Sequence, residues 1–362
     1  MNSKTPALVG ATALETFVRN IFSAAGCDAA EAGRIATHLV DANLAGHDSH
    51  GVARVPRYVE ALEAGYVVKG QTAEVVTDGG SFVVLDGKFG FGQTVAPQAV
   101  ALGIERACAN GLCVTALRNA GHIGRVGAYT ELALAAGLIS IHFVNVAGSV
   151  LVAPFGGVER RFSTAPFSIG VPLPGRPLLL DFATSHVAEG KVLVASRGGK
   201  PLPPDALVEP DGRLSGDPRT LYGAYTPVGP RDLTKGTGAI RAFGEHKGSG
   251  LALMCEMLGG ALTAGGTSGP VDRRERIANG MLSIFLSPRH FGTQAEFERI
   301  GLAYVEWVSG CRPIDPAAPV KLPGEPEAAT RAARLADGVS LPQDTWASIR
   351  AVAERLGVAM AV

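Results

Sequence analysis

Residues 46–58 read Gly46-His47-Asp48-Ser49-His50-Gly51-Val52-Ala53-Arg54-Val55-Pro56-Arg57-Tyr58, and the rest of the chain is organised around this stretch. It contains two histidines, an aspartate and a serine in four consecutive residues, and Arg54 follows His50 by four positions. A guanidinium group can hold a carboxylate through two parallel hydrogen bonds, and an imidazole one turn away can exchange a proton near neutral pH. The stretch therefore indicates a site where an arginine binds the carboxylate of a small acid and a histidine exchanges a proton with the adjacent oxygen of that acid.

The same stretch predicts a helix over residues 50–63, with Ser49 as its N-cap. Residues four apart stack on one face of a helix, so the second histidine, Arg54 and Tyr58 would lie together. The interior proline complicates this prediction, because proline kinks a helix or moves its start downstream. A polar loop before a solvated helix face is the alternative interpretation, and the polar motifs further along the chain count against it.

The bulk composition is typical of an α/β enzyme with more than one structural unit. The 362 residues include 33 basic and 33 acidic side chains, without single-sign runs, so we expect no nucleic-acid partner and no binding to an anionic membrane. The five cysteines are dispersed and form no CxxC pair, which argues against a disulfide framework or a structural zinc site. The first 22 residues lack a secretory pattern, and no apolar run reaches roughly 18 residues. We therefore expect a soluble cytoplasmic protein.

Helices are expected at both ends of the chain. Residues Thr12 to Glu15 form a capping box for a helix that ends near residue 25. Asp28 is expected to cap a second helix, which leads into the 46–58 stretch. The tail predicts two more helices, the last of which ends at Gly357. Residues 1–70 therefore look like a helical unit.

The middle of the chain alternates between strands and helices. A hairpin turn at 78–80 joins two strands near residues 73–76 and 82–85. The pattern predicts further strands at 112–117, 139–146, 178–181 and 281–286, and helices at 93–109, 127–137 and 295–309. Residues 198–238 are rich in proline, glycine and aspartate and predict a long surface excursion.

Two glycine-rich segments look suited to a nucleotide. Residues 121–127 carry glycines three apart before a helix, where the backbone can approach a ligand and the helix N-terminus favours an anion. Within that segment His122 is a second candidate acid or base. Lys247, at the start of the helix opened by residues 243–250, suits a phosphate or pyrophosphate. Ordinary turns with solvated side chains are the alternative for both segments.

Two nucleotide-binding fingerprints are missing from the sequence. No G-x-G-x-x-G opens a helix after a strand, and no GxxxxGK[ST] occurs. A dinucleotide, if one binds, must therefore use an architecture other than the Rossmann fold or the Walker loop.

Taken together, the motifs resemble those of the malate/L-lactate dehydrogenase family that is unrelated to the Rossmann enzymes. Within that family the resemblance is closest to the bacterial hydroxycarboxylate dehydrogenases, which act on 2-oxo and 2-hydroxy acids. It covers nearly the whole chain, and the motifs occur in the family's order at residues 45–51, 121–127, 181–185, 245–250 and 322–325.

The resemblance implies an α/β fold with two units. A helical unit built from both chain ends, residues 1–70 and 310–362, would pack on a largely antiparallel α/β unit, residues 71–309. It also implies a homodimer, and a hydride transfer between C4 of the nicotinamide of NAD or NADP and C2 of the acid. In such a reaction the cofactor does the hard chemistry and the protein positions and polarises.

The resemblance also implies roles for particular residues. Arg54 and Thr164 match substrate-contacting positions, and Tyr58 is expected beside Arg54. Ser49 and His50 resemble a proton-relay pair in the imine-reductase branch, whereas the ureidoglycolate branch points to His122. We expect His50 to be the principal acid or base. Cofactor contacts would fall on His122, Ile123, Gly124, Arg125, Val126, Asp181, Phe182, Ala183, Glu189, Gly190, Lys247, Gly324 and Glu325.

The chain departs from the family pattern at several positions. Ala165 stands where many members have asparagine, which puts contacts of that substrate loop in doubt. No aspartate occurs between Phe182 and Lys200, where the imine-reductase branch carries a relay aspartate, and this argues against an imine substrate. Glu189, if it lies near the adenosine 2′ position, would repel a phosphate and favour NAD.

The competing class is a metal-dependent hydratase or aldolase acting on 2-oxo acids. Its metal ligands would be His47, Asp48, His50 and His122. Nearly consecutive residues cannot easily direct all their side chains at one ion, so the sequence favours the dehydrogenase, for which no metal is expected. A non-catalytic nucleotide-binding protein is the third alternative.

Overall fold

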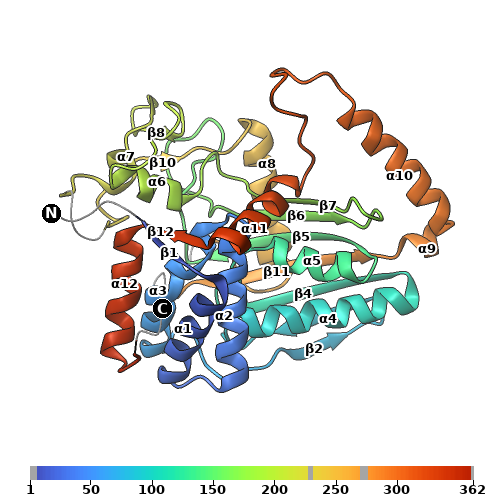
Figure 1. The fold of residues 1–362 in the computed structure, drawn as a ribbon, viewed down its shortest axis with the longest axis horizontal. Helices are drawn as coiled ribbons and strands as arrows, with labels where there is room; N and C mark the ends of the chain where they lie inside the picture. Colours follow the sequence, from blue (N-terminus) through green and yellow to red (C-terminus); the bar gives the residue numbers. More distant parts are fainter. Residues whose placement is uncertain (1–5, 227–230, 270–275, 360–362) are drawn as a thin grey trace.

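The computed structural model describes residues 6–226, 231–269 and 276–359, and a seven-stranded sheet lies at its centre (Figure 1). Neighbouring strands of the sheet pair antiparallel, except β3 with β4, which pair parallel. The sheet is therefore largely antiparallel, as predicted. Its strands, in spatial order, are β2 (Glu74–Asp78), β3 (Phe82–Asp86), β4 (Leu112–Ala120), β11 (Ala278–Leu286), β5 (Ile139–Ala147), β6 (Pro166–Val171) and β7 (Leu178–Ala183).

Helices cover both faces of this sheet, because alternate strand residues point to opposite sides. On β5, Val144 packs in the cluster that includes α4 (Gly92–Asn110) and α5 (Gly127–Ala135). Phe143, its neighbour in sequence, packs instead with α8 (His246–Cys255), which continues into a π-helical turn, Glu256–Ala261. The segment that was expected to open a helix near Lys247 does so.

The two ends of the chain meet in one helical unit. Strand β1 (Ala7–Val9) pairs antiparallel with β12 (Val339–Leu341), which brings the N-terminal and C-terminal segments side by side. A buried apolar cluster then joins the helices α1 (Ala11–Ala24), α2 (Ala29–Leu44), α3 (Val55–Glu63) and α12 (Gln343–Arg355) (Figure 1). The predicted fold class is confirmed. The unit boundaries, residues 1–70 with 310–362 and 71–309, stay predictions.

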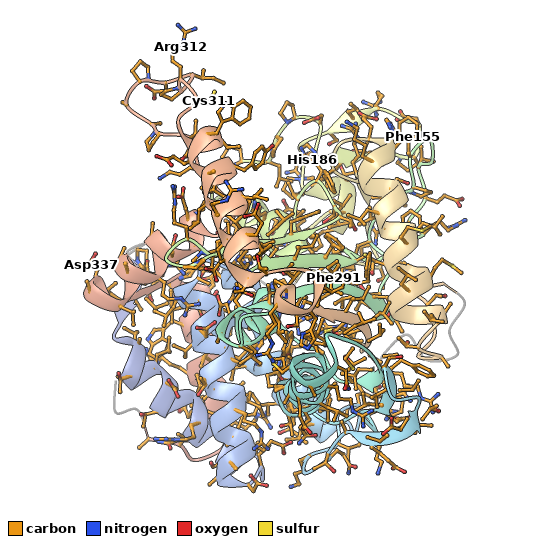
Figure 2. All side chains as sticks on the ribbon, turned by 90° about the vertical axis from the view of Figure 1, so that its right-hand side faces the viewer. Phe155, His186, Phe291, Cys311, Arg312 and Asp337 are labelled. Carbon is orange, nitrogen blue, oxygen red and sulfur yellow. The ribbon has the colours of Figure 1, made fainter. Side chains whose placement is uncertain are left out.

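Three further helices lie between β11 and β12. Helix α9 (Pro288–Phe291) leads into α10 (Gln294–Ser309), and α11 (Glu325–Asp337) returns to pack on α2. Figure 1 shows α10 at the edge of the molecule, and Figure 2 shows Cys311 and Arg312 just beyond its far end. One face of α10 packs through Val305 against Leu173 and Leu322.

The expectation of a surface excursion over residues 198–238 is wrong for much of that segment. Its described part holds the strands β8 (Leu207–Val208) and β9 (Leu214–Ser215) and the helix α7 (Arg219–Tyr222). Strand β10 (Ala239–Ile240), directly after the segment, joins the two strands in a small three-stranded sheet. These elements and α6 (Glu189–Ser196) share a buried apolar cluster around Leu207, Leu221 and Tyr222. The apolar residues are scattered among turn formers, so local periodicity did not reveal this core.

The helix starts show where local signals succeeded and where they failed. The Asp28 carboxylate accepts the Glu31 N–H at 2.7 Å and caps α2 as predicted. The capping box at Thr12 is wrong: α1 begins at Ala11 without a side-chain cap, and the Glu15 carboxylate accepts the Thr37 hydroxyl of α2 instead. Within the described ranges, no helix is both long and apolar enough to cross a membrane.

The helix predicted from His50 with Ser49 as N-cap is also wrong. Two 3₁₀ turns, Asp48–His50 and Val52–Arg54, precede α3, which begins at Val55. Extended backbone at Gly51 separates the turns, and Pro56 lies in the first turn of α3, where its missing N–H costs nothing.

Candidate active site

A small cavity of about 60 Å³ opens beside the start of α3. Four polar side chains line it: Arg54, Arg57, Tyr58 and His122. The first three come from the 46–58 stretch, and His122 comes from the turn between β4 and α5. The remaining wall is apolar or aromatic and consists of Ala61, Tyr66, Val67, Phe91 and Ile277. A charged grip and a titratable ring on one side of an apolar pocket suit a small organic acid.

Tyr58 connects the cavity to His122. Its hydroxyl lies 2.6 Å from Nδ1 of His122 and 3.4 Å from the carbonyl oxygen of the same residue. The buried amide of Gln93 donates from Nε2 to the Tyr58 oxygen at 3.2 Å and to the His122 carbonyl at 3.0 Å. When the His122 ring is neutral with its proton on Nε2, the Tyr58 hydroxyl donates to Nδ1, the nearer of its two acceptors. Within the part of the chain that the structure describes, Nε2 of His122 has no hydrogen-bond partner.

Electrostatics keep His122 neutral in the free protein. Burial lowers its pKa well below the ordinary value of 6.5, and the positive charge of Arg54 lowers it further. Burial likewise raises the pKa of Tyr58 to about 12, so its hydroxyl stays protonated. The neutral ring and the neutral phenol fit the hydrogen bond between them.

His50 and Ser49 lie next to this group. The His50 ring stacks on His122 with 5.6 Å between centroids and 10° between planes. Ser49 Oγ lies 3.2 Å from Nδ1 of His50, so the two predicted relay residues are in hydrogen-bond contact. The backbone carbonyl of Ser49 accepts Nε of Arg54 at 2.6 Å, which fixes the direction of the guanidinium. Burial, followed by the Arg54 charge, lowers the pKa of His50 to about 3.

The turn that carries His122 is held by distant side chains. The Ile123 N–H donates to Oδ1 of Asn279 on β11 at 2.9 Å. At the start of α5, the Gly127 N–H donates to Oδ2 of Asp181 at 2.8 Å. Burial raises the pKa of Asp181, while this N–H and the nearby Arg125 favour its ionised form. Asp181 therefore satisfies a free N–H group at the start of α5.

Arg125 is almost fully buried, at 1% exposure, in an ion network. Its Nη2 lies 3.0 Å from Asp41 and 2.7 Å from Glu131. Arg331 of α11 pairs with the same two carboxylates, so the network joins α2, α5 and α11. Nε and Nη1 of Arg125 have no partner within the described residues. Such orphaned buried donors are unusual and fit an anionic group of a ligand.

The segments predicted to hold a dinucleotide converge on the edge strand β7. Asp181 on β7 contacts the 121–127 turn, and Phe182 packs edge-on against Phe243 at 5.3 Å. The Leu179 N–H donates to the Pro323 carbonyl at 3.2 Å, which brings the 322–325 segment to the same strand. Gly324 adopts a left-handed conformation there (φ 94°). The orphaned Arg125 donors and these converging segments fit a dinucleotide laid along β7.

Glu189 and Gly190 begin α6 directly beside the 46–58 stretch. A Cβ on Gly190 would lie 2.7 Å from the Cβ of Ser49, so this contact needs glycine. The Glu189 carboxylate accepts a hydrogen bond from the hydroxyl of Tyr222. Tyr222 belongs to the small unit formed by β8, β9, β10 and α7. Glu189 is therefore positioned by that unit.

The structure does not join every predicted residue to the cavity. Lys247 is exposed at the start of α8, and Thr164 binds the backbone N–H and the hydroxyl of Thr184 through its carbonyl. No hydrogen bond or ring contact of the described residues connects either one to Tyr58 or His122. Glu325 accepts the Leu322 N–H at 3.0 Å and so caps its own turn.

The ligand set of the metal-site alternative diverges. His47 lies 3.6 Å from Glu327, and Asp48 pairs with Arg334 at 2.6 Å, both on α11. Across residues 6–226, 231–269 and 276–359, no three His, Cys, Asp or Glu side chains are grouped to hold a metal ion. The side chains of the 46–58 stretch therefore serve different partners.

Three residues of the site were missed by the sequence analysis: Gln93, Asn279 and Arg57. Gln93 and Asn279 lie inside a helix and a strand and act through contacts with residues far away in sequence, so no local signal could identify them. Arg57 could have been found, because it follows Arg54 by three positions and lies on the same side of α3.

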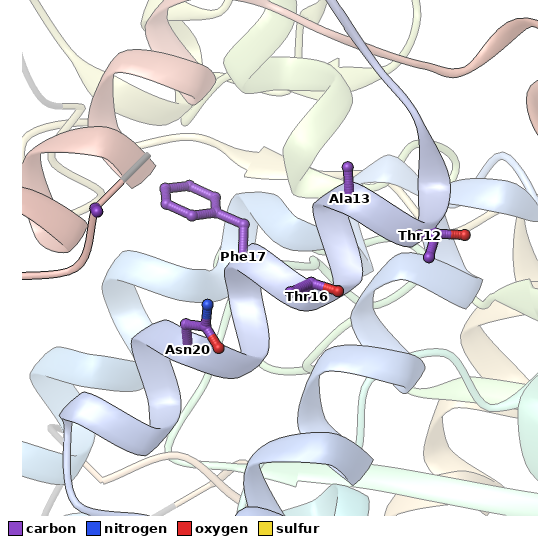
Figure 3. Close-up of a pocket in the computed structure, with 6 residues that line it drawn as sticks. Thr12, Ala13, Thr16, Phe17 and Asn20 are labelled. Atoms are coloured by element: carbon purple, nitrogen blue, oxygen red, sulfur yellow. The ribbon is translucent and has the colours of Figure 1, made fainter. Parts of the chain in front are cut away.

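A second hollow, of about 340 Å³, lies on α1 and is larger than the cavity at His122 (Figure 3). Its lining is Thr12, Ala13, Thr16, Phe17, Asn20 and Ala359. It contains no titratable side chain, so it offers no acid, base or charged grip. The smaller cavity is the candidate active site.

Fold and site together define a class: an oxidoreductase of hydroxy acids built on an α/β fold other than the Rossmann fold. The pattern of the family described as Malate/L-lactate dehydrogenase matches residues 9–350, and the chain belongs to that family. It is an enzyme, a hydroxycarboxylate dehydrogenase that interconverts a 2-hydroxy acid and its 2-oxo acid.

Similar proteins carry related names. Hydroxycarboxylate dehydrogenase B of Escherichia coli K12 is 40% identical over 355 residues, which cover 96% of this chain and 94% of the relative. L-lactate dehydrogenase of Cupriavidus necator is 34% identical, over 97% of this chain and 99% of its own. The solved sulfolactate dehydrogenase of Methanocaldococcus jannaschii superposes with a TM-score of 0.84 at 30% identity, covering 98% of both chains. Nothing in these relatives supports the hydratase or aldolase alternative.

Proposed function

We propose that this enzyme transfers a hydride between a nicotinamide dinucleotide and C2 of a small 2-oxo or 2-hydroxy acid bound in the cavity at His122. The observation that carries the proposal is the free Nε2 of His122 in a cavity that also presents Arg54. When bound, the nicotinamide supplies the two-electron acceptor or donor at its C4 position. The residues of the chain bind the acid, orient it and move its proton.

Arg54 holds the carboxylate of the acid in this proposal. Its Nε is engaged by the Ser49 carbonyl, which leaves the two terminal nitrogens for a paired contact with a carboxylate. The apolar wall that includes Phe91 and Ile277 then packs on the rest of the acid. Arg57 and Tyr66 stand at the same cavity and contact larger substituents.

His122 donates the proton to the C2 oxygen during reduction. In the free protein the Arg54 charge lowers the pKa of His122, and a carboxylate bound to Arg54 opposes that effect, so substrate binding favours uptake of a proton by the ring. Tyr58 can serve both states of the ring. Its hydroxyl donates to Nδ1 of the neutral imidazole, and it accepts from the protonated ring while turning its own proton to the His122 carbonyl, 3.4 Å away.

Ser49 and His50 then act behind His122. The sequence favoured His50 as the principal acid or base, and that assignment remains open to test. The cavity lining favours His122, because His122 is part of that lining, whereas His50 is not and only stacks on the His122 ring. Comparison of the two alanine variants decides between them.

The dinucleotide, NAD or NADP, is held along β7. We assign its contacts to the turn 122–126, Asp181 with Phe182 and Ala183, and the Gly324 turn, with Lys247 serving phosphate. In this proposal Glu189 lies near the adenosine 2′ position, where its carboxylate would repel a phosphate and favour NADH over NADPH. Thr164, two residues before β6, completes the substrate loop.

An assay of nicotinamide absorbance tests this function. A panel of 2-oxo acids, each offered with NADH and with NADPH, should give turnover with at least one pair, and the acid with the highest kcat/KM defines the substrate. Absence of turnover with every 2-oxo acid and both cofactors would contradict the proposal. A metal analysis of the active protein tests the hydratase alternative in the same preparation.

We further propose that the enzyme works as a homodimer. The face of α10 that points away from Val305 exposes Ile300, Tyr304 and Trp307, at 54%, 64% and 74%. Tyr304 and Trp307 stack on one another in solvent at 5.8 Å, and such an apolar patch is typical of an interface. Light scattering should give twice the chain mass, and Trp307→Glu should lower it; a fully active monomer would overturn this.

A cytoplasmic location completes the proposal. All five cysteines are free, as expected in a reducing compartment. Cell fractionation with a periplasmic and a cytoplasmic marker enzyme would test it.

A further inference from the structure

His38 is a titratable residue that the proposed reaction does not use. It lies in the middle of α2, and its Nε2 accepts the backbone N–H of Arg125 at 3.2 Å. The ring also packs against Tyr129 of α5, with 5.7 Å between centroids. His38 therefore contacts the turn that carries His122 at Arg125, whereas Tyr58 contacts it at His122 itself.

The turn is shaped around the imidazole. Gly124 adopts a left-handed conformation (φ 76°), and a Cβ there would lie only 2.3 Å from Nε2 of His38. Tyr129, whose ring His38 contacts, donates its hydroxyl to the Ile123 carbonyl at 2.6 Å. One N–H and one carbonyl of the turn are thus held by two side chains that pack on each other.

We infer that His38 is a positioning residue, which holds His122 in place by accepting the Arg125 N–H through an unprotonated Nε2. The inference rests on the proposed role of His122. Since Nε2 accepts, the proton of the neutral ring must be on Nδ1. A second proton on Nε2 would face the N–H donor, break the bond and release the turn, so His122 would no longer meet the substrate oxygen.

The surroundings favour the neutral ring. Burial and, to a smaller extent, the Arg125 charge lower the pKa of His38 to about 4, with Asp41 partly opposing them. His50 and His122 also face His38, and they would repel it if both were charged. Tyr129, the remaining titratable neighbour, stays neutral because burial raises its pKa. The hydrogen bond is therefore intact at neutral pH and lost in acid.

Two kinds of variant test the role. His38→Gln places an amide oxygen close to the position of Nε2 and keeps an acceptor that does not titrate, whereas His38→Leu removes the acceptor. A displacement of about 1 Å at a reacting group can cost roughly a hundredfold in rate. We expect His38→Leu to lower kcat tenfold to a hundredfold and, because the turn 122–126 also contacts the dinucleotide in the proposed function, to weaken dinucleotide binding. His38→Gln should restore both to within about threefold of the original enzyme.

The pH profile separates positioning from simple stabilisation. In acid, the slope of log kcat against pH should be smaller by one proton in His38→Gln than in the original enzyme. If His38→Leu fails to fold, His38→Asn takes its place, because its acceptor is too short to reach the Arg125 N–H. Unchanged kcat in the acceptor-free variant, or equal losses with Gln and Leu, would overturn the inference.

Failure of the proposed function would look different. Full turnover in His122→Ala would remove the proton role from His122 and leave the effect of His38 on the turn to be measured by nicotinamide fluorescence of the bound dinucleotide. A loss of binding in His38→Leu that Gln restores would still support the positioning of the turn. Equal binding in both variants would count against it.

Discussion

Two histidines of this enzyme, His142 and His122, are both buried but differ in what their ring nitrogens contact. His142 lies on β5, fully buried, with Nδ1 2.8 Å from the Ser283 hydroxyl and Nε2 3.1 Å from that of Ser140. His122 lies in a turn, with Nδ1 bound to Tyr58 and Nε2 without a partner among the described residues. Burial lowers the pKa of both rings, to about 3 for His142.

The comparison shows that a shifted pKa does not by itself mark an active site. Desolvation acts on any buried imidazole, because it penalises the charged form. What distinguishes His122 is a ring nitrogen without a partner among the described residues, and a place in the lining of a cavity that Arg54 also lines. Both nitrogens of His142 are satisfied by serines of the sheet, so His142 is a structural residue.

The largest expected effect separates the two rings directly. His122→Ala should lower kcat by roughly 10²–10⁴, because general acid–base catalysis contributes about that much. His142→Gln, a polar replacement in the sheet, should leave kcat nearly unchanged. Steady-state turnover with bound dinucleotide followed by fluorescence checks both variants. If His50→Ala abolishes turnover while His122→Ala keeps it, the proton belongs to His50 and the comparison fails.

The second prediction sharpens the claim that His122 faces a substrate. Arg54→Ala removes a charge-assisted contact worth roughly 1.5–3 kcal/mol, so the KM for the oxo acid should rise about tenfold to a hundredfold or more. Binding of NADH should be retained. Arg57→Ala provides the matched comparison and should have a smaller effect, because Arg57 is exposed at the mouth. A larger effect at Arg57 would move the carboxylate grip to that residue.

The third prediction concerns whether Lys247 contacts the dinucleotide and not the oxo acid. Lys247→Ala should raise the KM for the dinucleotide by about tenfold, with the oxo-acid KM little changed, since an exposed charged contact with phosphate is worth on the order of 1–2 kcal/mol. Lys88→Ala is the control, because Lys88 pairs with Glu74 on the distant hairpin. Equal changes in both Michaelis constants would contradict the assignment.

The last expected effect is on stability and not on turnover. The pKa of His142 is about 3 in the folded protein and 6.5 as its ordinary value, so the unfolded chain binds a proton in this range that the folded protein excludes. The free energy of unfolding should therefore rise with pH between about 3 and 6.5. The stabilising contribution of the neutral His142 should be complete above about pH 6.5. Each such histidine contributes a slope of about 1.4 kcal/mol per pH unit.

Urea unfolding of the original enzyme and of His142→Gln, at several pH values from 4.5 to 7.5, measures this slope. The slope of the free energy of unfolding against pH should be smaller in the variant by the contribution of one proton. The pKa values of His122 and His50 are lowered in the same direction, so the free energy of unfolding of both proteins should still depend on pH. Identical slopes would show that His142 is not kept neutral by burial.

Local sequence signals determined much of the fold. Strand positions followed from runs of β-branched residues, and the Asp28 cap of α2 followed from side-chain chemistry within three residues. The start of α3 was uncertain from sequence, because Pro56 allows two starts, and the structure selects the later one. The core of the small unit around Leu207 was missed, since its apolar residues meet only after the chain has folded back.

The sequence by itself determined which reactive residues this protein has: the histidines and Arg54 of the 46–58 stretch, the glycine-rich turn at His122, and the family order of its motifs. Only the tertiary structure decided how they meet. Tyr58 reaches His122 across 64 positions, and Arg331 reaches Asp41 across 290. Such contacts depend on sheet register and helix packing, which no local pattern encodes, and they leave one nitrogen of His122 free while satisfying both nitrogens of His142.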